Sequence, residues 1–193
     1  MEAGEQQRQI YHERQRLQFC LLHALNNLLQ VEDSFTRAEV DAIADKLILD
    51  DPDKPRWTPF SVVFGPHHNR LTGNYDVNVL IAALEGRGKR VIWHDRRNGA
   101  SSIGLGRSNE TLMGIMLNVP VKRFAGLWRS RHWISLRRID GVWYNLDSDL
   151  DRPKSFKDEE EVIEFLDDIV SHGAEVFVVL SESSLFPDSS QAC

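Results

Sequence analysis

Cys20 is the residue of this 193-residue chain with the clearest capacity for nucleophilic chemistry. It lies in the stretch RLQFCLLHALNNLLQ, where leucines at helical spacing predict an amphipathic helix that begins near the cysteine. Unpaired backbone N–H groups and the positive end of a helix dipole favour a thiolate at such a position. Gln15, five residues earlier, offers an amide donor for an oxyanion. The alternative is an inert buried thiol, the usual fate of a free cysteine.

A cysteine nucleophile needs a histidine base, and the chain contains seven histidines. His23 lies one helical turn after Cys20, a spacing that more often packs the ring than presents a base to a substrate. His67 and His68 resemble a metal ligand pair, but no nearby cysteines complete a site. His132 is the preferred candidate, because it begins a predicted β-hairpin whose second strand is rich in polar residues.

The hairpin prediction rests on Asp140-Gly141, a two-residue turn signal between two β-rich runs. With these residues as the loop, the register places His132 directly opposite Asp149, and Asp147 is the diagonal neighbour. A carboxylate there could hold the imidazole in one tautomer, as the third member of a catalytic triad does. The pattern alone does not choose between Asp147 and Asp149, and a solvated acidic face is an equal alternative.

The remaining pattern predicts an α+β fold in which early helices precede a mostly antiparallel set of strands. Thr36 and Glu39 form a capping-box signature for a helix that ends near Leu49, and Asp76 is the expected N-cap of the next helix. Further segments are predicted as follows: strands in 89–95, 111–120 and 174–180, a glycine- and serine-rich loop at 96–109, and an acidic amphipathic helix within 157–173 that ends at Gly173. The strand at 174–180 is expected in the interior of the sheet, because every residue in it except Glu175 is apolar.

Composition narrows the possible partners and location. The net charge of −6 argues against nucleic acid as the main partner, because phosphate binding needs a basic surface. Cys20 and Cys193, the two cysteines, lie at opposite ends of the sequence and make neither a disulfide framework nor a CxxC metal ligand set. The polar start of the chain is not a secretory signal, and no run reaches the ~20 apolar residues of a membrane span. We expect a cytoplasmic monomer without cofactor, metal or membrane anchor, with the nucleus as a second location left open.

Three blocks of the sequence resemble one family when they are taken together and in order: YHERQRLQFCLLHALNNLLQ, GNYDVNVLIAAL and RHWISLRRIDGVWYNLDS. They are similar to the Josephin family of deubiquitinating cysteine proteases, and to its short stand-alone members in particular. The resemblance covers roughly residues 10–181. It implies a papain-like α+β fold, in which a helix that carries the thiol packs on a mainly antiparallel sheet that carries the base.

The resemblance also implies a role for each site residue. Cys20 matches the nucleophile, His132 the general base and acid, Asp147 the residue that orients the histidine, and Gln15 the oxyanion-hole glutamine. It therefore favours Asp147 over Asp149. The implied reaction is hydrolysis of the isopeptide bond at the C-terminal glycine of ubiquitin through a thioester, so ubiquitin and its conjugates are the expected partners.

The predicted organisation is a disordered N-terminus at 1–9, a catalytic domain at 10–181 and a flexible tail at 182–193. The proline-rich segment 50–72 departs from the family, because some members carry a helical hairpin there that helps to hold ubiquitin. Trp133 is a candidate wall for the channel of a narrow Gly-Gly tail, with an ordinary core tryptophan as the alternative. A ubiquitin-binding adaptor and a papain-like acyl transferase are the competing functions.

Overall fold

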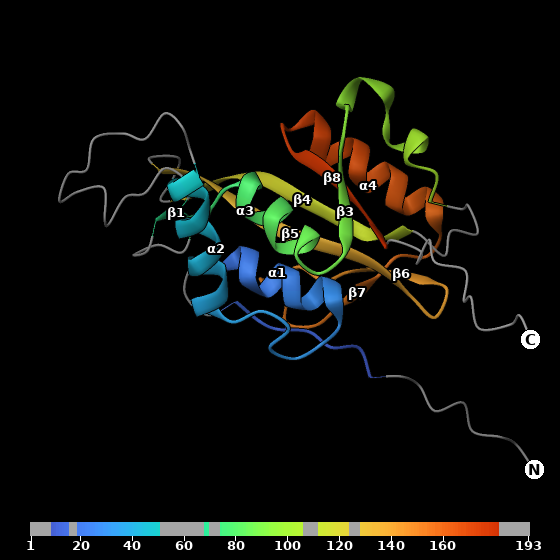
Figure 1. Cartoon of the computed structure of the whole chain (residues 1–193). Coiled ribbons are helices and arrows are strands. Elements are labelled where there is room, and N and C mark those ends of the chain that lie inside the picture. The colour runs from blue at the N-terminus through green and yellow to red at the C-terminus, as the bar shows by residue number, and fades with distance from the viewer. Residues whose placement is uncertain are drawn as a thin grey trace, which may run out of the picture.

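The computed structural model describes residues 9–15, 19–50, 68–69, 74–105, 112–123 and 128–181, and the α+β prediction is confirmed (Figure 1). Six strands form one sheet in the order β3-β8-β4-β5-β6-β7, and every neighbouring pair is antiparallel. Their bounds are β3 Lys89–His94, β4 Leu112–Arg123, β5 Trp128–Ile139, β6 Val142–Asn145, β7 Lys154–Ser155 and β8 Glu175–Ser181. The apolar strand β8 lies inside the sheet, as expected. A separate short pair joins β1 (His68–Asn69) to β2 (Asn74–Tyr75).

Helices cover both faces of this sheet. Helices α1 (Cys20–Leu29), α2 (Arg37–Asp50) and α3 (Val77–Glu85) share one apolar cluster with Met116, whereas α4 (Glu159–Ser171) shares another with Ile115. Because neighbouring residues of a strand point to opposite faces, Ile115 and Met116 assign the two clusters to opposite sides of β4. The site residues of α1 therefore belong to the face that α1, α2 and α3 cover.

Local signals account for where the helices begin. The amide of Thr36 donates to Glu39 Oε2 at 2.7 Å, and the amide of Glu39 donates to Thr36 Oγ1 at 3.3 Å, so the predicted capping box is present. Asp76 Oδ1 accepts from the amides of Asn78 and Val79, as an N-cap should. Gly173 follows the end of α4 with a φ of 92°, a conformation that favours glycine.

The close approach of α1 to the sheet depends on Gly114 in β4. A Cβ atom at this position would lie 2.5 Å from the carbonyl oxygen of Leu136 and 2.7 Å from Leu28 Cδ1. Arg137, on the neighbouring strand β5, donates to the carbonyl oxygen of Leu28 and so satisfies the end of the helix. Glycine at 114 therefore lets α1 lie against β4 and β5, the strand that carries His132.

One predicted loop contains short helical turns, and other predicted segments lie outside the described residues. The predicted loop at 96–109 contains two short 3-10 turns, Arg96–Asn98 and Ala100–Ile103, of which the Asp95 carboxylate caps the first. The expected disordered start, the flexible tail at 182–193 and most of the segment 50–72 lie outside the described residues. Among the described helices, none is both long and apolar enough to cross a membrane.

Candidate active site

Cys20 is the first residue of α1, as the sequence predicts. Its side chain is a free thiol and is buried, with 4% of its surface exposed. The preceding residue, Phe19, occupies the N-cap position, and its side chain has no atom that can accept a hydrogen bond from the first turn. The helix thus presents backbone N–H groups and its positive dipole end beside the sulfur, a setting that favours negative charge there.

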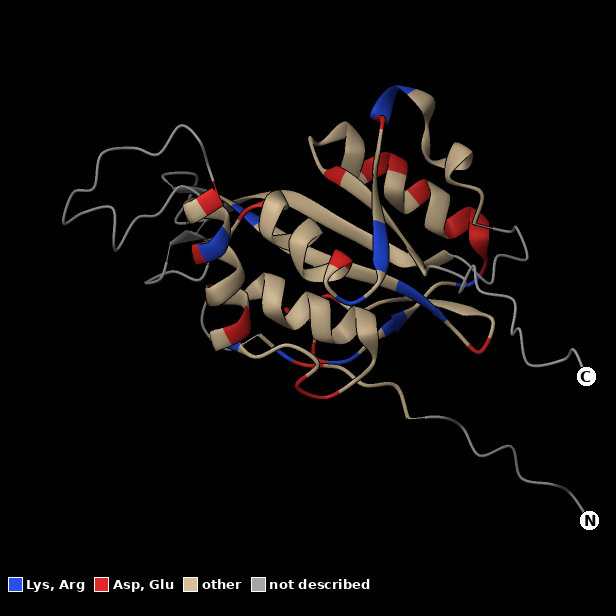
Figure 2. Cartoon of the chain, viewed as in Figure 1, with Lys and Arg blue, Asp and Glu red and all other residues tan. Residues whose placement is uncertain are grey.

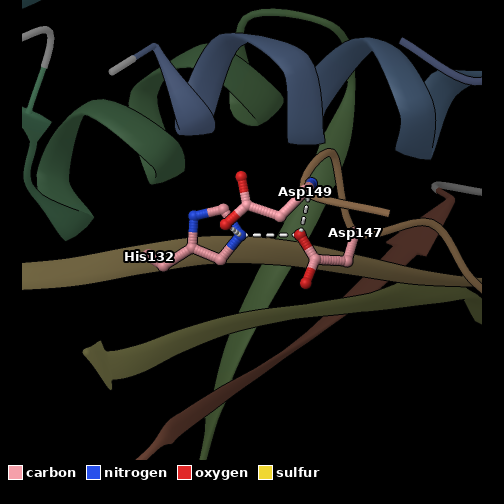
Figure 3. Close-up of side chains that lie close together, drawn as sticks. All are labelled: His132, Asp147 and Asp149. Carbon is pink, nitrogen blue, oxygen red and sulfur yellow. Dashed lines mark hydrogen bonds and ion pairs between the residues drawn. The ribbon is translucent and has the colours of Figure 1, made fainter. Parts of the chain in front are cut away.

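The structure brings His132, Asp147 and Asp149 together beneath α1 (Figure 3). His132 Nε2 lies 2.6 Å from Asp147 Oδ1, a hydrogen bond, and 3.6 Å from Asp149 Oδ2. The histidine is 4% exposed, although it is a polar side chain on a strand. Of the two carboxylates that the pattern left open, Asp147 is the direct partner of the imidazole, and Asp149 is a second, more distant negative charge.

The pairing of His132 with Asp149 that the hairpin register predicted is wrong. The turn itself is as expected, with positive φ at Asp140 (48°) and Gly141 (84°), and Ile139 pairs with Val142. The pairing of β5 with β6 ends, however, at Leu136 and Asn145. The extrapolation to His132 thus assumed strand pairing that the chain does not form.

Polar residues at the end of β6 and just after it explain why the strand ends there. The amide of Asp147 donates to Asn145 Oδ1 at 2.9 Å, and the amide of Asp149 donates to Asp147 Oδ1 at 2.9 Å. Side-chain acceptors of this kind replace the ladder with turns. The Oδ1 atom of Asp147 therefore accepts from both His132 and the Asp149 backbone, which holds the carboxylate toward the ring.

The charges around His132 favour its protonated form. Burial alone would lower the pKa of this imidazole, but interactions with Asp147, and to a lesser extent with Cys20, raise it from 6.5 to about 10. His132 Nδ1 is buried and makes no hydrogen bond of ordinary length and angle to a described residue. Cys20 is near enough to the ring to affect its pKa, but the contact does not have the geometry of an ordinary hydrogen bond.

Gln15 lies in the segment 9–15, which runs alongside α1 and which we call the strap. Its backbone N–H donates to the carbonyl oxygen of Ser148 at 2.8 Å, next to Asp147 in the chain. Its side-chain Oε1 is buried and receives no hydrogen bond from a described residue. His12, another strap residue, donates from Nε2 to the carbonyl oxygen of Asp147 at 3.0 Å. The strap thus ties Gln15 to the turn that carries Asp147, a link that sequence reasoning missed.

Two other expectations have clear outcomes in the structure. His23 Nδ1 pairs with Glu13 Oε2 at 2.7 Å, which gives this histidine a partner on the strap. Trp133 is 2% exposed and donates from Nε1 to the carbonyl oxygen of Tyr75 at 3.1 Å, so it is a core residue and not a channel wall. Both rings serve packing and local hydrogen bonding.

His132, Asp147 and Asp149 are also the described group whose ligand atoms lie close enough to hold a metal, all within 4.8 Å of one another. The hydrogen bond that the imidazole donates to Asp147 already accounts for the arrangement of His132 and Asp147 without an ion. The expectation that the protein uses no cofactor or metal stays a prediction.

Comparison with known proteins places the chain in a family. The family model called Josephin matches residues 15–180. A Josephin-like protein of Arabidopsis thaliana is 63% identical over 168 residues, which are 87% of this chain and 46% of that protein, so the chain spans about half of its length. Josephin-2 of Mus musculus is 41% identical over 90% of this chain and 87% of its own. A Josephin-like protein of Drosophila melanogaster is 39% identical over 94% and 78%. The chain belongs to the Josephin family.

Proposed function

We propose that the protein is a cysteine-type deubiquitinase that hydrolyses isopeptide bonds at the C-terminal glycine of ubiquitin. The observation that carries the proposal is the short hydrogen bond between His132 and Asp147 beside the Cys20 thiol, at a helix start without a side-chain cap. Membership of the Josephin family supports the same reaction. Ubiquitin and its conjugates are the proposed partners, and we propose that the enzyme acts as a cytoplasmic monomer without a cofactor.

The first half of the reaction forms a thioester. The Cys20 thiolate attacks the carbonyl carbon of the ubiquitin C-terminal glycine, and the carbonyl oxygen becomes an oxyanion. When the tetrahedral intermediate collapses, the C–N bond breaks and the His132 imidazolium gives its proton to the departing lysine amine. The raised pKa of His132 suits this step, because the ring is already protonated before the attack.

The second half regenerates the enzyme. Neutral His132 takes a proton from water, the resulting hydroxide attacks the thioester carbonyl, and the C–S bond breaks to release ubiquitin with a free carboxylate. Asp147 holds the imidazole in the orientation that both halves need. The side-chain amide of Gln15 and the backbone N–H of Cys20 are the proposed donors to the oxyanion in each half.

The test combines a covalent probe with a turnover assay. The protein is mixed with ubiquitin that carries a C-terminal electrophile, and cleavage of di-ubiquitin is followed in parallel. We expect a stable adduct and turnover for the wild type, and neither for Cys20→Ala. Cys193→Ala is the matched control, because it removes the other thiol of the chain and should retain both activities.

Other outcomes would identify a competing function. Binding of ubiquitin without an adduct or turnover, in a folded protein and with active control enzymes, would favour a ubiquitin-binding adaptor. Alkylation of Cys20 by small electrophiles without reaction with the ubiquitin probe would favour an acyl transferase that acts on another substrate. Equal cleavage by Cys20→Ala and wild type would show that Cys20 is not the nucleophile.

A further inference from the structure

Asn27, on α1, is a fully buried polar side chain that the proposed reaction does not use, and its exposed fraction is 0%. It lies seven residues after Cys20, about two helical turns along the same face. Burial of an amide is costly unless its donors and acceptor are paired. The partners of Asn27 therefore indicate what this side chain does in the fold.

All three hydrogen bonds of the Asn27 side chain go to backbone groups of the segments that carry the other site residues. Its Oδ1 accepts from the amide of Glu13 at 2.6 Å, and its Nδ2 donates to the carbonyl oxygen of Glu13 at 3.1 Å. The same Nδ2 donates to the carbonyl oxygen of Leu146 at 3.0 Å. Glu13 lies two residues before Gln15, and Leu146 lies directly before Asp147.

Gln30, the C-cap residue that follows α1, makes a similar pair of contacts about one turn further along the chain. Its Oε1 accepts from the amide of Tyr11 at 3.1 Å, and its Nε2 donates to the carbonyl oxygen of Tyr11 at 2.9 Å. Asn27 and Gln30 thus hold alternate strap residues by both backbone groups, as a neighbouring strand would. Gln30 differs in one respect, because its side-chain hydrogen bonds reach the strap and its own helix and not the turn at Asp147.

We infer that Asn27 is a positioning residue that sets the place of Gln15 and Asp147 relative to Cys20. The Asn27 amide binds both the strap and the turn before Asp147. The positions of Gln15 and Asp147 relative to Cys20 therefore depend on the same side chain. The inference rests on the proposed function in one respect, since the effect on rate assumes the Cys20 reaction. The docking of the two segments does not depend on it.

The kinetic test uses Asn27→Ala with Gln30→Ala as the matched control. A displacement of about 1 Å can cost about 10²-fold in rate, so we expect Asn27→Ala to lower kcat by about 10- to 100-fold with KM changed less than about threefold. Gln30→Ala removes two contacts to Tyr11, four residues before Gln15, and none to the turn at Asp147, so it should lower kcat by less than about threefold. Equal kcat values for the two variants would overturn the inference.

A double-mutant cycle with Gln15→Ala separates positioning from general loss of structure. If Asn27 acts through Gln15, the effect of Gln15→Ala on kcat should be several-fold smaller in the Asn27→Ala background than in the wild type. Independent effects that simply multiply would refute this route. Asn27→Ser, a milder change, takes the place of Asn27→Ala if the latter does not fold.

Hydrogen exchange of backbone amides provides a readout without ubiquitin. In Asn27→Ala, the amides of Glu13 and Gln15 should both exchange faster than in the wild type, whereas Gln30→Ala should affect chiefly Tyr11. Unchanged protection of Gln15 in Asn27→Ala would overturn the inference. If the wild type formed no Cys20 adduct with the ubiquitin probe, the proposed function would fail, and the exchange data would still decide whether Asn27 holds the strap.

Discussion

Helices α1 and α4 pack on opposite faces of the same sheet, yet their first turns are built in opposite ways. Helix α4 begins with Asp158, whose carboxylate accepts from the amide of Glu161 at 2.9 Å, and its first turn contains three glutamates. These acidic residues are visible along α4 (Figure 2). Helix α1 begins with Phe19 as its N-cap residue and has no acidic residue in its first turn. Carboxylates stabilise a helix start and would repel a thiolate. The start of α4 therefore suits stability, whereas the start of α1 suits the nucleophile that we propose.

The buried sides of the two helices also differ, because only α1 buries polar side chains. The buried residues of α4 are Val162 and Leu166, both apolar. Helix α1 buries leucines as well, but it also buries Asn26 and Asn27, which bind backbone groups outside the helix. A buried amide contributes less than a packed apolar side chain and demands specific partners. Part of the buried face of α1 therefore consists of amides that hold neighbouring segments in place, where apolar side chains would otherwise pack.

We expect the largest effect from Asp147→Asn, which changes the candidate site beneath α1. The pKa of His132 is about 10 mainly because hydrogen bonding and charge from Asp147 outweigh burial, so the neutral amide should lower it toward its ordinary value near 6.5. An NMR titration of the ring measures this shift, and kcat for di-ubiquitin should fall with it. An unchanged pKa of His132 would show that Asp147 does not control its charge.

The same raised pKa predicts how stability varies with pH. A histidine that is easier to protonate in the folded state contributes stability fully below its unfolded pKa near 6.5, and this contribution is lost as the pH rises toward 10. Denaturant unfolding at several pH values measures the free energy of unfolding of wild type and Asp147→Asn. The wild type should be the more stable, by an amount that shrinks as the pH rises through this window. A stability advantage that grew with pH would contradict the predicted direction.

We expect an effect of intermediate size from Leu166→Ala, which changes the apolar cluster under α4. Leu166 is fully buried, and its truncation should lower the free energy of unfolding by about 2–5 kcal/mol. The rate per folded molecule should stay near that of the wild type, because this side chain packs in the cluster on the face opposite α1. Denaturant unfolding and assays at a temperature where the variant is folded give the two values. A tenfold loss of kcat in the folded variant would show that the two faces are coupled.

The smallest expected effect concerns the cap of α4. Asp158→Ala removes the acceptor for Glu161 and should lower Tm by ~2–4 °C without a change in kcat. The backbone hydrogen bond from Glu161 lowers the pKa of Asp158 below 3.8, so the contribution is present above that pH and lost as the pH falls below it. Thermal unfolding at neutral and acid pH checks both statements. If the Tm difference between wild type and Asp158→Ala increased in acid, the ionised Asp158 carboxylate would not be the source of the stability.

The sequence by itself determined the features that depend on a few neighbouring residues. Asp76 begins α3, Thr36 and Glu39 form their capping box, and Asp140-Gly141 makes the hairpin turn, because each needs only contacts within about four residues. The motif blocks also brought Cys20, His132, Asp147 and Gln15 together as candidates through their resemblance to a family.

Only the tertiary structure decided which groups meet. The residue pattern left Asp147 and Asp149 open as the partner of His132, and the resemblance could only favour Asp147. The geometry depends on where β6 ends, and that end is set by the amides of Asp147 and Asp149, which donate to Asn145 Oδ1 and Asp147 Oδ1. Asn27 and Leu146 are 119 residues apart in the sequence, and no pattern along the chain pairs them. Their contact forms because the apolar face of α1 packs on the sheet, and burial there leaves the amide no solvent to replace its backbone partners.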